Sequence, residues 1–432
     1  MKSTRRKFLA VAASAPLPLL ATRPRSWQKR RPTRIDERLR IGVIGVGGRG
    51  AANLAGVASE QVVALCDVDA RRLEAATANH KDAETFVDGR EMIETSKLDA
   101  VVVSTPDHTH APLSARALRR GLHVYCEKPL THTVQEARVL RDLAKRHDRV
   151  TQMGIQIHAT DNYRRVVEAL RAGSIGAVSE VYAFCNSKAW ANGRLPAKAD
   201  KEPEWLDWDV WLGPAAAHDF HEGSYHPENW RRYWDFGGGT LADMACHLLD
   251  LPWWALELDA PLRVAAEGPE VHPVGTPDRM HVRFEHAARG ERRAVTVHWY
   301  DGGTRPAILD EVGLKQWNFG LLFVGEDGRW LVTDYGKHAF GPQERFADYR
   351  APEPTLPKSI GHHAEWIQAI KDGKKALCDF AYSGLLTEAV LLGNVAYRCG
   401  AELEWKSETM EVKGSDAAKA LLAKEYRRGW EL

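Results

Sequence analysis

The sequence predicts an α/β protein with two domains, and three observations support this prediction. Short apolar strands alternate with helices between residues 39 and 155, and a Gly-x-Gly-x-x-Gly turn follows the first strand. After residue 156 the pattern changes to strands in which apolar and polar residues alternate. The first pattern is typical of a parallel sheet and the second of a mostly antiparallel sheet. A chain of 432 residues is long enough to bury both cores.

The first 38 residues are expected to be a signal peptide and a linker. Arg5 and Arg6 precede Lys-Phe-Leu, as in a twin-arginine export signal, and the apolar run Phe8–Ala21 overlaps this motif. A run of 14 residues is too short to span a membrane and suits the apolar part of a signal peptide. We therefore expect export of the folded protein to the periplasm, with membrane tethering if the signal is not cleaved. A basic, unstructured N-terminus is the alternative interpretation.

The charge distribution argues against two classes of partner. The whole chain carries 59 basic and 58 acidic residues, but residues 1–31 hold nine Lys or Arg and no acid. The rest of the chain is therefore acidic, which argues against nucleic acid and anionic membranes as partners. Six cysteines without a Cys-x-x-Cys motif predict free thiols rather than a disulfide framework.

Residues 39–155 are expected to form a Rossmann dinucleotide-binding domain. The helices of this region include Thr109–Arg120 and Thr133–Lys145. The expected strands are Arg40–Ile44, Val62–Asp67, Thr85–Val87, Ala100–Ser104, Val124–Glu127 and Val150–Met153. Their runs of Val and Ile are typical of parallel strands that are buried on both faces.

The glycine motif is the predicted cofactor site. Gly45 permits the tight turn, Gly47 lets the backbone approach a pyrophosphate, and Gly50 lets the helix pack on the strand. Gly48 and Arg49 complete the turn, where the helix N-terminus favours phosphate.

Asp67 ends the second strand, where a carboxylate accepts hydrogen bonds from the adenosine ribose. This acid favours NAD, although Arg71 and Arg72 close by keep NADP as an alternative.

Residues 156–432 are expected to form an α+β domain with a large open, mostly antiparallel sheet. A long irregular stretch at about 186–236 is rich in Trp and His, which argues for a functional segment. Asp327-Gly328 predicts a hairpin turn between the last two strands. The expected strands are Val178–Cys185, Leu262–Glu267, Met280–Glu285, Ala294–Tyr300, Leu321–Val324 and Arg329–Thr333, and the helices are Asn162–Ala172, His363–Ile370 and Leu385–Tyr397.

Two elements carry the predicted chemistry. Lys128 follows the fifth strand in Cys-Glu-Lys-Pro, at the sheet edge where ligands of parallel sheets bind, and its ammonium can stabilise a developing alkoxide. Asp243 and His247 are four residues apart on one helical face, after a run of three glycines. His247 can take a hydroxyl proton, and Asp243 can orient it or bind a neighbouring hydroxyl. Taken alone, each element also fits a purely structural role.

The glycine fingerprint, the Glu127-Lys128-Pro129 step and the Gly-Gly-Gly…Asp243-x-x-x-His247 helix together resemble the Gfo/Idh/MocA oxidoreductase family. The resemblance spans the chain after the linker. It implies NAD(P)-dependent oxidation or reduction of a carbinol of a sugar, glycoside or cyclitol. Lys128 would be the active-site lysine, His247 the proton acceptor and Asp243 its companion. The segment after the fourth strand, with Thr105, Pro106, His108 and His110, would lie beside the cofactor together with Glu127.

Further assignments are weaker. The residues expected to face substrate are Gln156, His158, Trp230, Arg231 and His363. No His-x-x-x-His or His-Glu-x-x-His spacing occurs, so we expect no metal site. The family resemblance implies a homo-oligomer, either a dimer or a tetramer.

Export and a dinucleotide fold together restrict the function. A compartment outside the cytoplasm has no dependable pool of nicotinamide cofactor, so we expect NAD to stay tightly bound and to be regenerated in place. One alternative is a redox-neutral NAD-dependent glycosidase or lyase that passes through a transient keto-sugar. The other is a non-catalytic protein that binds a sugar or a nucleotide.

Overall fold

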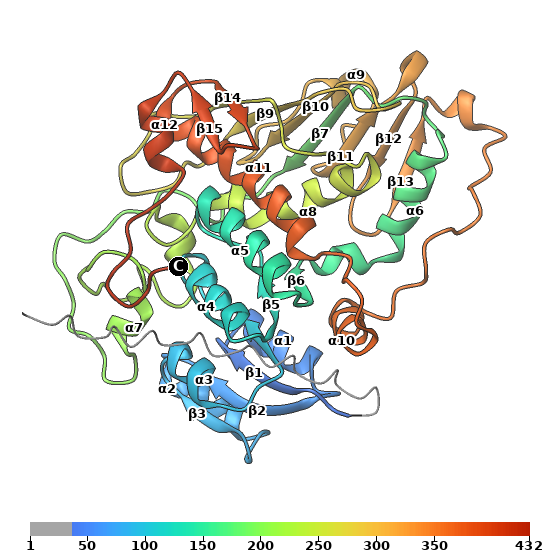
Figure 1. Ribbon diagram of the computed structural model, residues 1–432. Coiled ribbons are helices and arrows are strands. Elements are labelled where there is room, and N and C mark those ends of the chain that lie inside the picture. The colour runs from blue at the N-terminus through green and yellow to red at the C-terminus, as the bar shows by residue number, and fades with distance from the viewer. Residues whose placement is uncertain (1–36) are drawn as a thin grey trace, which may run out of the picture.

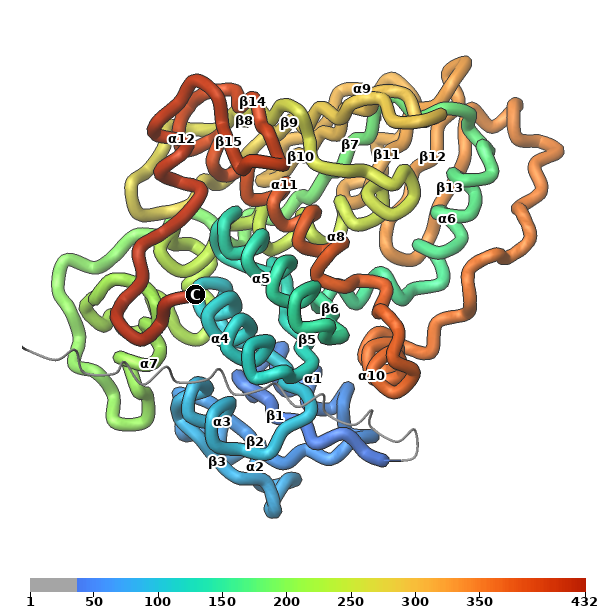
Figure 2. Tube along the Cα trace, viewed as in Figure 1, coloured from blue at the N-terminus to red at the C-terminus, as the bar shows by residue number. Residues whose placement is uncertain are grey.

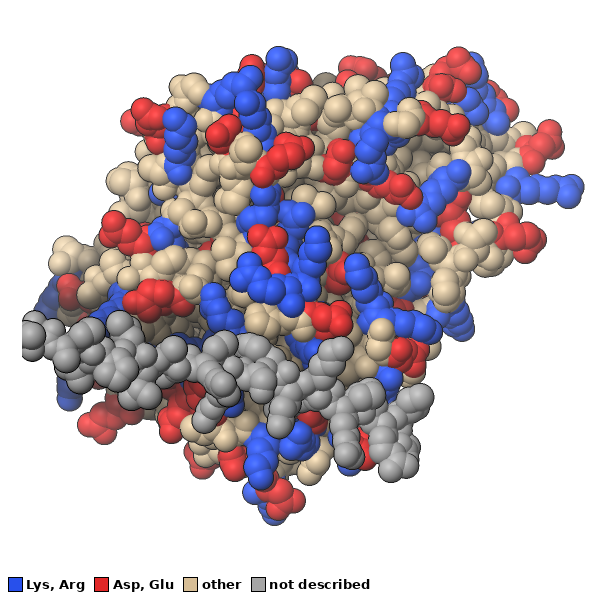
Figure 3. Space-filling model, in the orientation of Figure 1, with Lys and Arg blue, Asp and Glu red and all other residues tan. Residues whose placement is uncertain are grey.

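The computed structural model describes residues 37–432, which form two sheets (Figures 1 and 2). The twin-arginine motif and the apolar run that follows it lie outside these residues. Within residues 37–432, no helix combines the length and the apolar character that crossing a membrane requires. On the face shown in Figure 3, basic and acidic side chains are interspersed.

The first sheet is parallel, with the strand order β3-β2-β1-β4-β5-β6. Every residue of β4 is buried, as expected for a strand covered on both faces. The six predicted strands are confirmed to within one residue at either end. They are β1 (Arg40–Ile44), β2 (Gln61–Cys66), β3 (Glu84–Phe86), β4 (Ala100–Val103), β5 (His123–Glu127) and β6 (Thr151–Gly154).

Helices cover both faces of this sheet. Ile41 and Val43 point to one face, which packs against α1 and, from far along the chain, against Trp366 and Ile370 of α10. Ile44 and Val101 belong to the core on the other side. The helices are α1 (Arg49–Gly56), α2 (Ala70–Thr77), α3 (Gly89–Thr95), α4 (Asp107–Arg119), α5 (Val134–His147) and α10 (His362–Asp372).

The second sheet has the order β13-β12-β11-β7-β10-β9-β8-β14-β15. Its neighbours pair antiparallel except β7 with β10, so the predicted, mostly antiparallel sheet is confirmed. The strands are β7 (Glu180–Cys185), β8 (Arg263–Glu267), β9 (His281–His286), β10 (Val295–Tyr300), β11 (Phe319–Val324), β12 (Trp330–Thr333), β13 (His338–Gly341), β14 (Leu403–Lys406) and β15 (Glu411–Lys413). The sequence did not predict the last three, which are short and lie at the edges of the sheet.

One face of the second sheet packs against long helices, and the other is partly covered by a short one. Leu241 of α8 and Leu386 of α11 share a core with Val297 of the sheet. On the opposite face, Phe184 packs against Leu309 of α9. The helices of this part are α6 (Asp161–Arg171), α7 (Trp208–Leu212), α8 (Gly239–Ala255), α9 (Ile308–Glu311), α11 (Phe380–Cys399) and α12 (Asp416–Leu421), with 3-10 turns η1 (Gln156–Ala159), η2 (Asn229–Arg232), η3 (Glu326–Gly328) and η4 (Gln343–Phe346).

A buried ion-pair cluster joins the two halves of the molecule. Both carboxylate oxygens of Glu388 on α11 accept hydrogen bonds from Arg138 on α5, each at 2.9 Å. Arg141, one turn further along α5, donates to Glu388 Oε1 at 2.7 Å. The Glu388 side chain is only 2% exposed, so it depends on these two arginines for its solvation.

We predict that Glu388→Gln lowers the stability of the whole protein. The substitution leaves two arginines without their shared counter-ion, which costs about 3 kcal/mol when the pair is largely buried. Thermal unfolding followed by circular dichroism measures the loss. The matched control is Glu402→Gln, which removes an exposed pair with Arg283 and costs less than about 1 kcal/mol. Equal melting temperatures for the two variants would contradict this assignment.

Candidate active site

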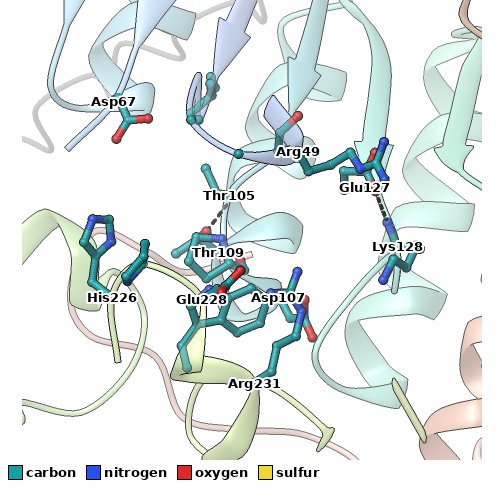
Figure 4. A pocket seen from close by; sticks show the side chains of 18 of the residues that line it. Arg49, Asp67, Thr105, Asp107, Thr109, Glu127, Lys128, His226, Glu228 and Arg231 are labelled. Carbon is teal, nitrogen blue, oxygen red and sulfur yellow. Dashed lines mark hydrogen bonds between the residues drawn. The ribbon is translucent and has the colours of Figure 1, made fainter. Parts of the chain in front are cut away.

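A cavity of about 920 Å³ lies between the two halves of the molecule, and residues of both line it (Figure 4). The parallel sheet contributes the glycine turn after β1, the end of β2, the loop after β4 and Lys128 after β5. The C-terminal part contributes α8, Tyr335 and residues of the long segment 186–236. The cavity therefore lies at the carboxyl ends of the parallel strands, where ligands of this architecture bind.

The glycine turn has the shape that a dinucleotide requires. Gly45 has a φ of 79°, and a Cβ on Gly50 would lie 1.8 Å from the carbonyl oxygen of Gly45. Gly47, Gly48 and Arg49 line the cavity, and α1 begins at Arg49. The backbone is thus bare where a pyrophosphate would approach, and a helix N-terminus faces it. These residues fit NAD.

Asp67 lies at the end of β2 and lines the cavity. Its carboxylate accepts hydrogen bonds from the backbone N–H groups of Val46, at 2.9 Å, and Asp69, at 3.0 Å. Burial raises its pKa from the ordinary value despite these two bonds. The carboxylate has lone pairs left, so it can accept hydrogen bonds from ribose hydroxyls.

The structure distinguishes the two arginines that follow. Arg72 lines the cavity, and its guanidinium lies against Gly47. Arg71, which the sequence placed at the cofactor, instead lies over the ring of Trp205 and pairs with Asp69. This differs from the prediction because α2 turns Arg71 away from the cavity and toward segment 186–236.

The loop after β4 divides into lining and supporting residues. Thr105 and Pro106 line the cavity, as predicted. His108 and His110 do not; both are buried in α4, and their rings hydrogen-bond to backbone carbonyls. His108 Nε2 lies 3.0 Å from the oxygen of Trp211, and the His110 ring bridges the carbonyls of Thr105 and Pro129. These two histidines therefore hold the loops that form the site rather than facing the cofactor.

Lys128 and Asp243 form the centre of the site. The Lys128 ammonium donates to the Asp243 carboxylate and, at 2.8 Å, to its backbone oxygen. The two side chains are 11% and 12% exposed, so this ion pair is largely shielded from water. It links the end of β5 directly to α8.

Asp243 receives two further donors from outside α8. Arg231 Nε lies 3.2 Å from Oδ1, and Trp190 Nε1 donates to Oδ2 at 2.7 Å. Burial alone would raise the pKa of Asp243, but Lys128 and Arg231 lower it far below its ordinary value. Asp243 is therefore a fixed negative charge that holds Lys128 in place. Among residues 37–432, the Asp243 oxygens contact Lys128, Trp190 and Arg231 rather than the His247 ring, so the orienting role expected for Asp243 toward His247 is not seen.

His247 lies on the same face of α8 and lines the cavity. Its ring nitrogen Nδ1 is buried and has no hydrogen-bond partner among residues 37–432. Burial, helped by the positive charge of Lys128, lowers the pKa of His247 to about 3. The imidazole is thus neutral at ordinary pH and able to accept a proton.

Glu127, the residue directly before Lys128, is held by a network of hydrogen bonds that includes Gln156. The Gln156 amide donates to Glu127 at 2.8 Å and to the Tyr125 hydroxyl at 2.9 Å. Asn53 of α1 donates to the same Glu127 oxygen at 2.9 Å. Both Glu127 and Gln156 line the cavity, as predicted.

Two residues that were expected to face substrate lie behind the cavity wall. His158 is 1% exposed and stacks on Trp254, with Nδ1 3.0 Å from both carboxylate oxygens of Asp250. His363 stacks on Tyr125 and meets Asn53 Oδ1 at 2.9 Å. Both rings are needed for packing between elements, which the local sequence does not reveal.

One group of side chains has the residue types of a metal site. Ligand atoms of His158, Asp250 and Cys378 lie within 4.8 Å of one another, all buried. Asp250 is already the acceptor of the Tyr382 hydroxyl and the partner of His158. Tyr382 and His158 thus serve as hydrogen-bond partners of the Asp250 carboxylate within the described part of the chain.

Several lining residues were not assigned by sequence reasoning. They are Asp107, Thr109, Trp190, His226, Glu228, Tyr335 and Trp430, while Trp230 and Arg231 line the cavity as predicted. Asp107 faces the site from the first turn of α4, and burial raises its pKa to about 8. Asp107 lies shortly after the fourth strand, and this position could have indicated it as a residue of the site. The others come from irregular segments whose position depends on tertiary packing.

Comparison with known proteins places the chain in a family. The Gfo/Idh/MocA family model described as an oxidoreductase family with an NAD-binding Rossmann fold matches residues 39–155. The model for the C-terminal α/β domain of the same family matches residues 164–303. The two matches follow one another along the chain in the order of the two sheets.

Similar proteins of named activity include inositol 2-dehydrogenases. Inositol 2-dehydrogenase 3 of Saccharopolyspora erythraea is 34% identical over 376 residues, which cover 83% of this chain and 94% of that protein. An inositol 2-dehydrogenase of Rubrobacter xylanophilus is also 34% identical, but over 147 residues that span only 42% of its length.

Solved structures share the fold at low sequence identity. The WlbA dehydrogenase of Bordetella pertussis, crystallised with NADH and UDP-GlcNAcA, superposes with a TM-score of 0.60 at 17% identity. The superposition covers 86% of this chain and 99% of that one. The fold, the two domain matches and the full-length relative together show that this chain belongs to the Gfo/Idh/MocA oxidoreductase family.

Proposed function

We propose that the protein is an NAD-dependent oxidoreductase that acts on a ring hydroxyl or carbonyl of a sugar, glycoside or cyclitol. The observation that carries the proposal is the position of Lys128 and His247 in the same cavity as the glycine turn. An ammonium donor and a neutral imidazole thus face the space beside the cofactor cradle. The relatives named inositol 2-dehydrogenase support a cyclic polyol as the substrate class.

The chain's own residues account for the proton chemistry. When bound, NAD supplies a two-electron acceptor for the hydride of a carbinol carbon. His247 takes the hydroxyl proton on its neutral imidazole, and Lys128 donates a hydrogen bond to the oxygen as negative charge develops there. Asp243 holds the ammonium in a fixed orientation through its carboxylate and its backbone oxygen. In the reverse direction, His247 returns the proton to the carbonyl oxygen.

The same cavity holds groups suited to a sugar ring. The ring centres of Trp190 and Trp230 lie 5.1 and 4.2 Å from the central carbon of the Arg231 guanidinium. Aromatic rings fit the apolar faces of pyranoses, and a planar guanidinium donates to vicinal oxygens. We infer that these residues orient the ring whose hydroxyl meets His247.

The predicted export signal bears on how the cofactor is regenerated. We propose that the protein acts in the periplasm with NAD resident, so that each turnover ends with the hydride passed on. It passes either to a second carbonyl or back to the same sugar, as in the redox-neutral glycosidase that the sequence also allows.

We predict that His247→Asn lowers the rate of NAD reduction by sugars and cyclitols at least about 100-fold, because a general base of this kind contributes that much or more. The protein should still bind NAD, since His247 lies outside the glycine turn. The absorbance of reduced nicotinamide after mixing with a panel of sugars and cyclitols measures the rate, and the NAD released from the denatured protein measures binding. The control is His272→Asn, on a residue outside the cavity lining. Wild-type rates in H247N would rule out His247 as the base.

We predict that the acid limb of kcat/KM lies well below pH 6.5. The pKa of His247 is lowered to about 3, so the base stays unprotonated as the pH falls through the range where a free histidine charges. Initial rates measured from pH 4.5 to 8 in buffers of constant ionic strength test this. A limb near pH 6.5 would show that His247 titrates as an exposed histidine.

Product analysis separates the two chemistries. For a dehydrogenase we expect, in a single turnover without a second carbonyl acceptor, a keto-sugar or keto-cyclitol in a 1:1 ratio with reduced cofactor. A glycosidase would instead release free sugar and aglycone with no net reduced cofactor. Mass spectrometry of products from matched glycosides and free sugars makes the distinction, with denatured enzyme as the control.

A further inference from the structure

A stretch of the long segment lies directly against the part of the Rossmann domain that carries Asp67. We call residues 203–228 the strap. The backbone N–H of Asp207 donates to Val68 at 3.0 Å, and the N–H of Ala70 donates to Trp205 at 2.9 Å. Asp69 and Leu206 thereby form an antiparallel bridge. The strap is thus hydrogen-bonded, as a strand would be, to the turn between β2 and α2.

Side chains reinforce this backbone contact. The Arg71 guanidinium lies 3.3 Å from the centre of the Trp205 ring. His226 Nε2 lies 3.0 Å from an oxygen of Asp69, which is fully buried. Burial by itself would raise the pKa of Asp69, but Arg71 and His226 lower it to about 2, so its carboxylate is charged. Polar and aromatic contacts therefore join the strap to the turn between β2 and α2, although the two are far apart in the sequence.

The strap has its own apolar core, so it is more than a loose loop. Trp208 and Trp211 stack with ring centres 4.7 Å apart. Trp208 and Phe220 pack edge-on, with ring centres 5.3 Å apart. These rings belong to a separate buried cluster, which Val68 of the Rossmann domain joins. A segment built in this way can resist displacement as a unit.

Residues 422–432, which we call the tail, contact both the strap and α3 of the Rossmann domain. The backbone N–H of Arg427 donates to Pro214 at 3.2 Å, and its guanidinium pairs with Asp209. Three residues on, Trp430 lies under the Arg90 guanidinium of α3, at 4.0 Å. In Figure 1 the red tail runs down from α12 and ends beside α4, near α7.

The strap and the tail both reach the cavity. His226, Pro227 and Trp430 line it together with Asp67 and Gly47. In Figure 4, His226 lies across the cavity from Asp67, on the side away from Lys128. That is the side where an adenosine ribose would meet Asp67.

We propose that the strap and the tail close the adenosine end of the cavity and retain NAD between turnovers. This inference rests on the proposed function for its importance, since a resident cofactor is what redox chemistry outside the cytoplasm would require. Release of NAD then requires the strap to separate from the turn at residues 67–71. Entry of NAD requires the same separation, so the contacts between strap and turn set the rates of both processes.

The test is the rate of NAD exchange in the full chain. Protein loaded with NAD labelled in the adenine ring is freed of excess label by gel filtration, and unlabelled NAD is then added. For Trp205→Ala with His226→Ala we expect label to leave about tenfold faster or more, because two contacts that hold the strap are gone. Binding of NAD to the apoprotein should also become faster, which a mere loss of ligand contacts would not produce.

The matched control is His221→Ala, which alters the strap internally without touching the turn, since His221 bonds to the carbonyl of Lys198. Its exchange rate should equal that of the wild type. If the double variant fails to fold, Arg71→Ala removes the contact with Trp205 from an exposed side chain and is expected to act in the same direction.

Two outcomes would overturn the proposal: a wild-type protein that exchanges NAD as fast as the double variant, or a double variant that releases label without binding NAD faster. No sugar is present in these measurements. A protein that retains NAD but oxidises no sugar would therefore contradict the proposed function alone, and fast exchange would contradict retention alone.

Discussion

The site depends on one ion pair, Lys128 with Asp243, which bridges the two domains in a place that water barely reaches. A buried carboxylate tends to lose its charge without a partner. Here the ammonium of Lys128 lowers the pKa of Asp243, so the carboxylate stays ionised. Arg231 at Oδ1 and Trp190 at Oδ2 also contact the carboxylate, so its orientation, and with it that of the ammonium, is fixed. The neutrality of His247 follows from the same arrangement, since a positive neighbour and a dry surrounding both disfavour its protonated form.

Sequence reasoning found the parts of the site that obey local rules. The glycine turn, Asp67, Lys128 and the pair Asp243 and His247 each follow from a strand end, a turn or a helical spacing. The contacts that these residues make with one another could not be predicted from the same local rules. The sequence suggested that Asp243 orients His247, whereas the carboxylate is used by donors from two other segments. Trp190 lies 53 residues before Asp243 in irregular chain, and no periodicity indicates such a contact.

Four histidines account for most of the differences between the predicted and the observed site. His108, His110, His158 and His363 are near strand ends or helix starts, where exposure to a ligand is a natural expectation. All four instead satisfy polar groups inside the protein, three of them within the shell that surrounds the cavity. A neutral imidazole both donates and accepts, so it suits buried junctions between elements as well as it suits catalysis. The edge strands β13, β14 and β15 were missed because each is too short for its alternation to stand out.

The position of α10 affects how this chain reaches its native state. Trp366 and Ile370 cover a face of the parallel sheet whose own strands are complete by residue 154. During synthesis from the N-terminus, α1 can cover part of this face early, but more than 200 further residues must leave the ribosome before α10 covers the rest. Over that interval the early strands expose a surface that other chains could bind. The maturation of the first domain is thus tied to the completion of the second, which favours folding after translation, as a unit, over folding domain by domain.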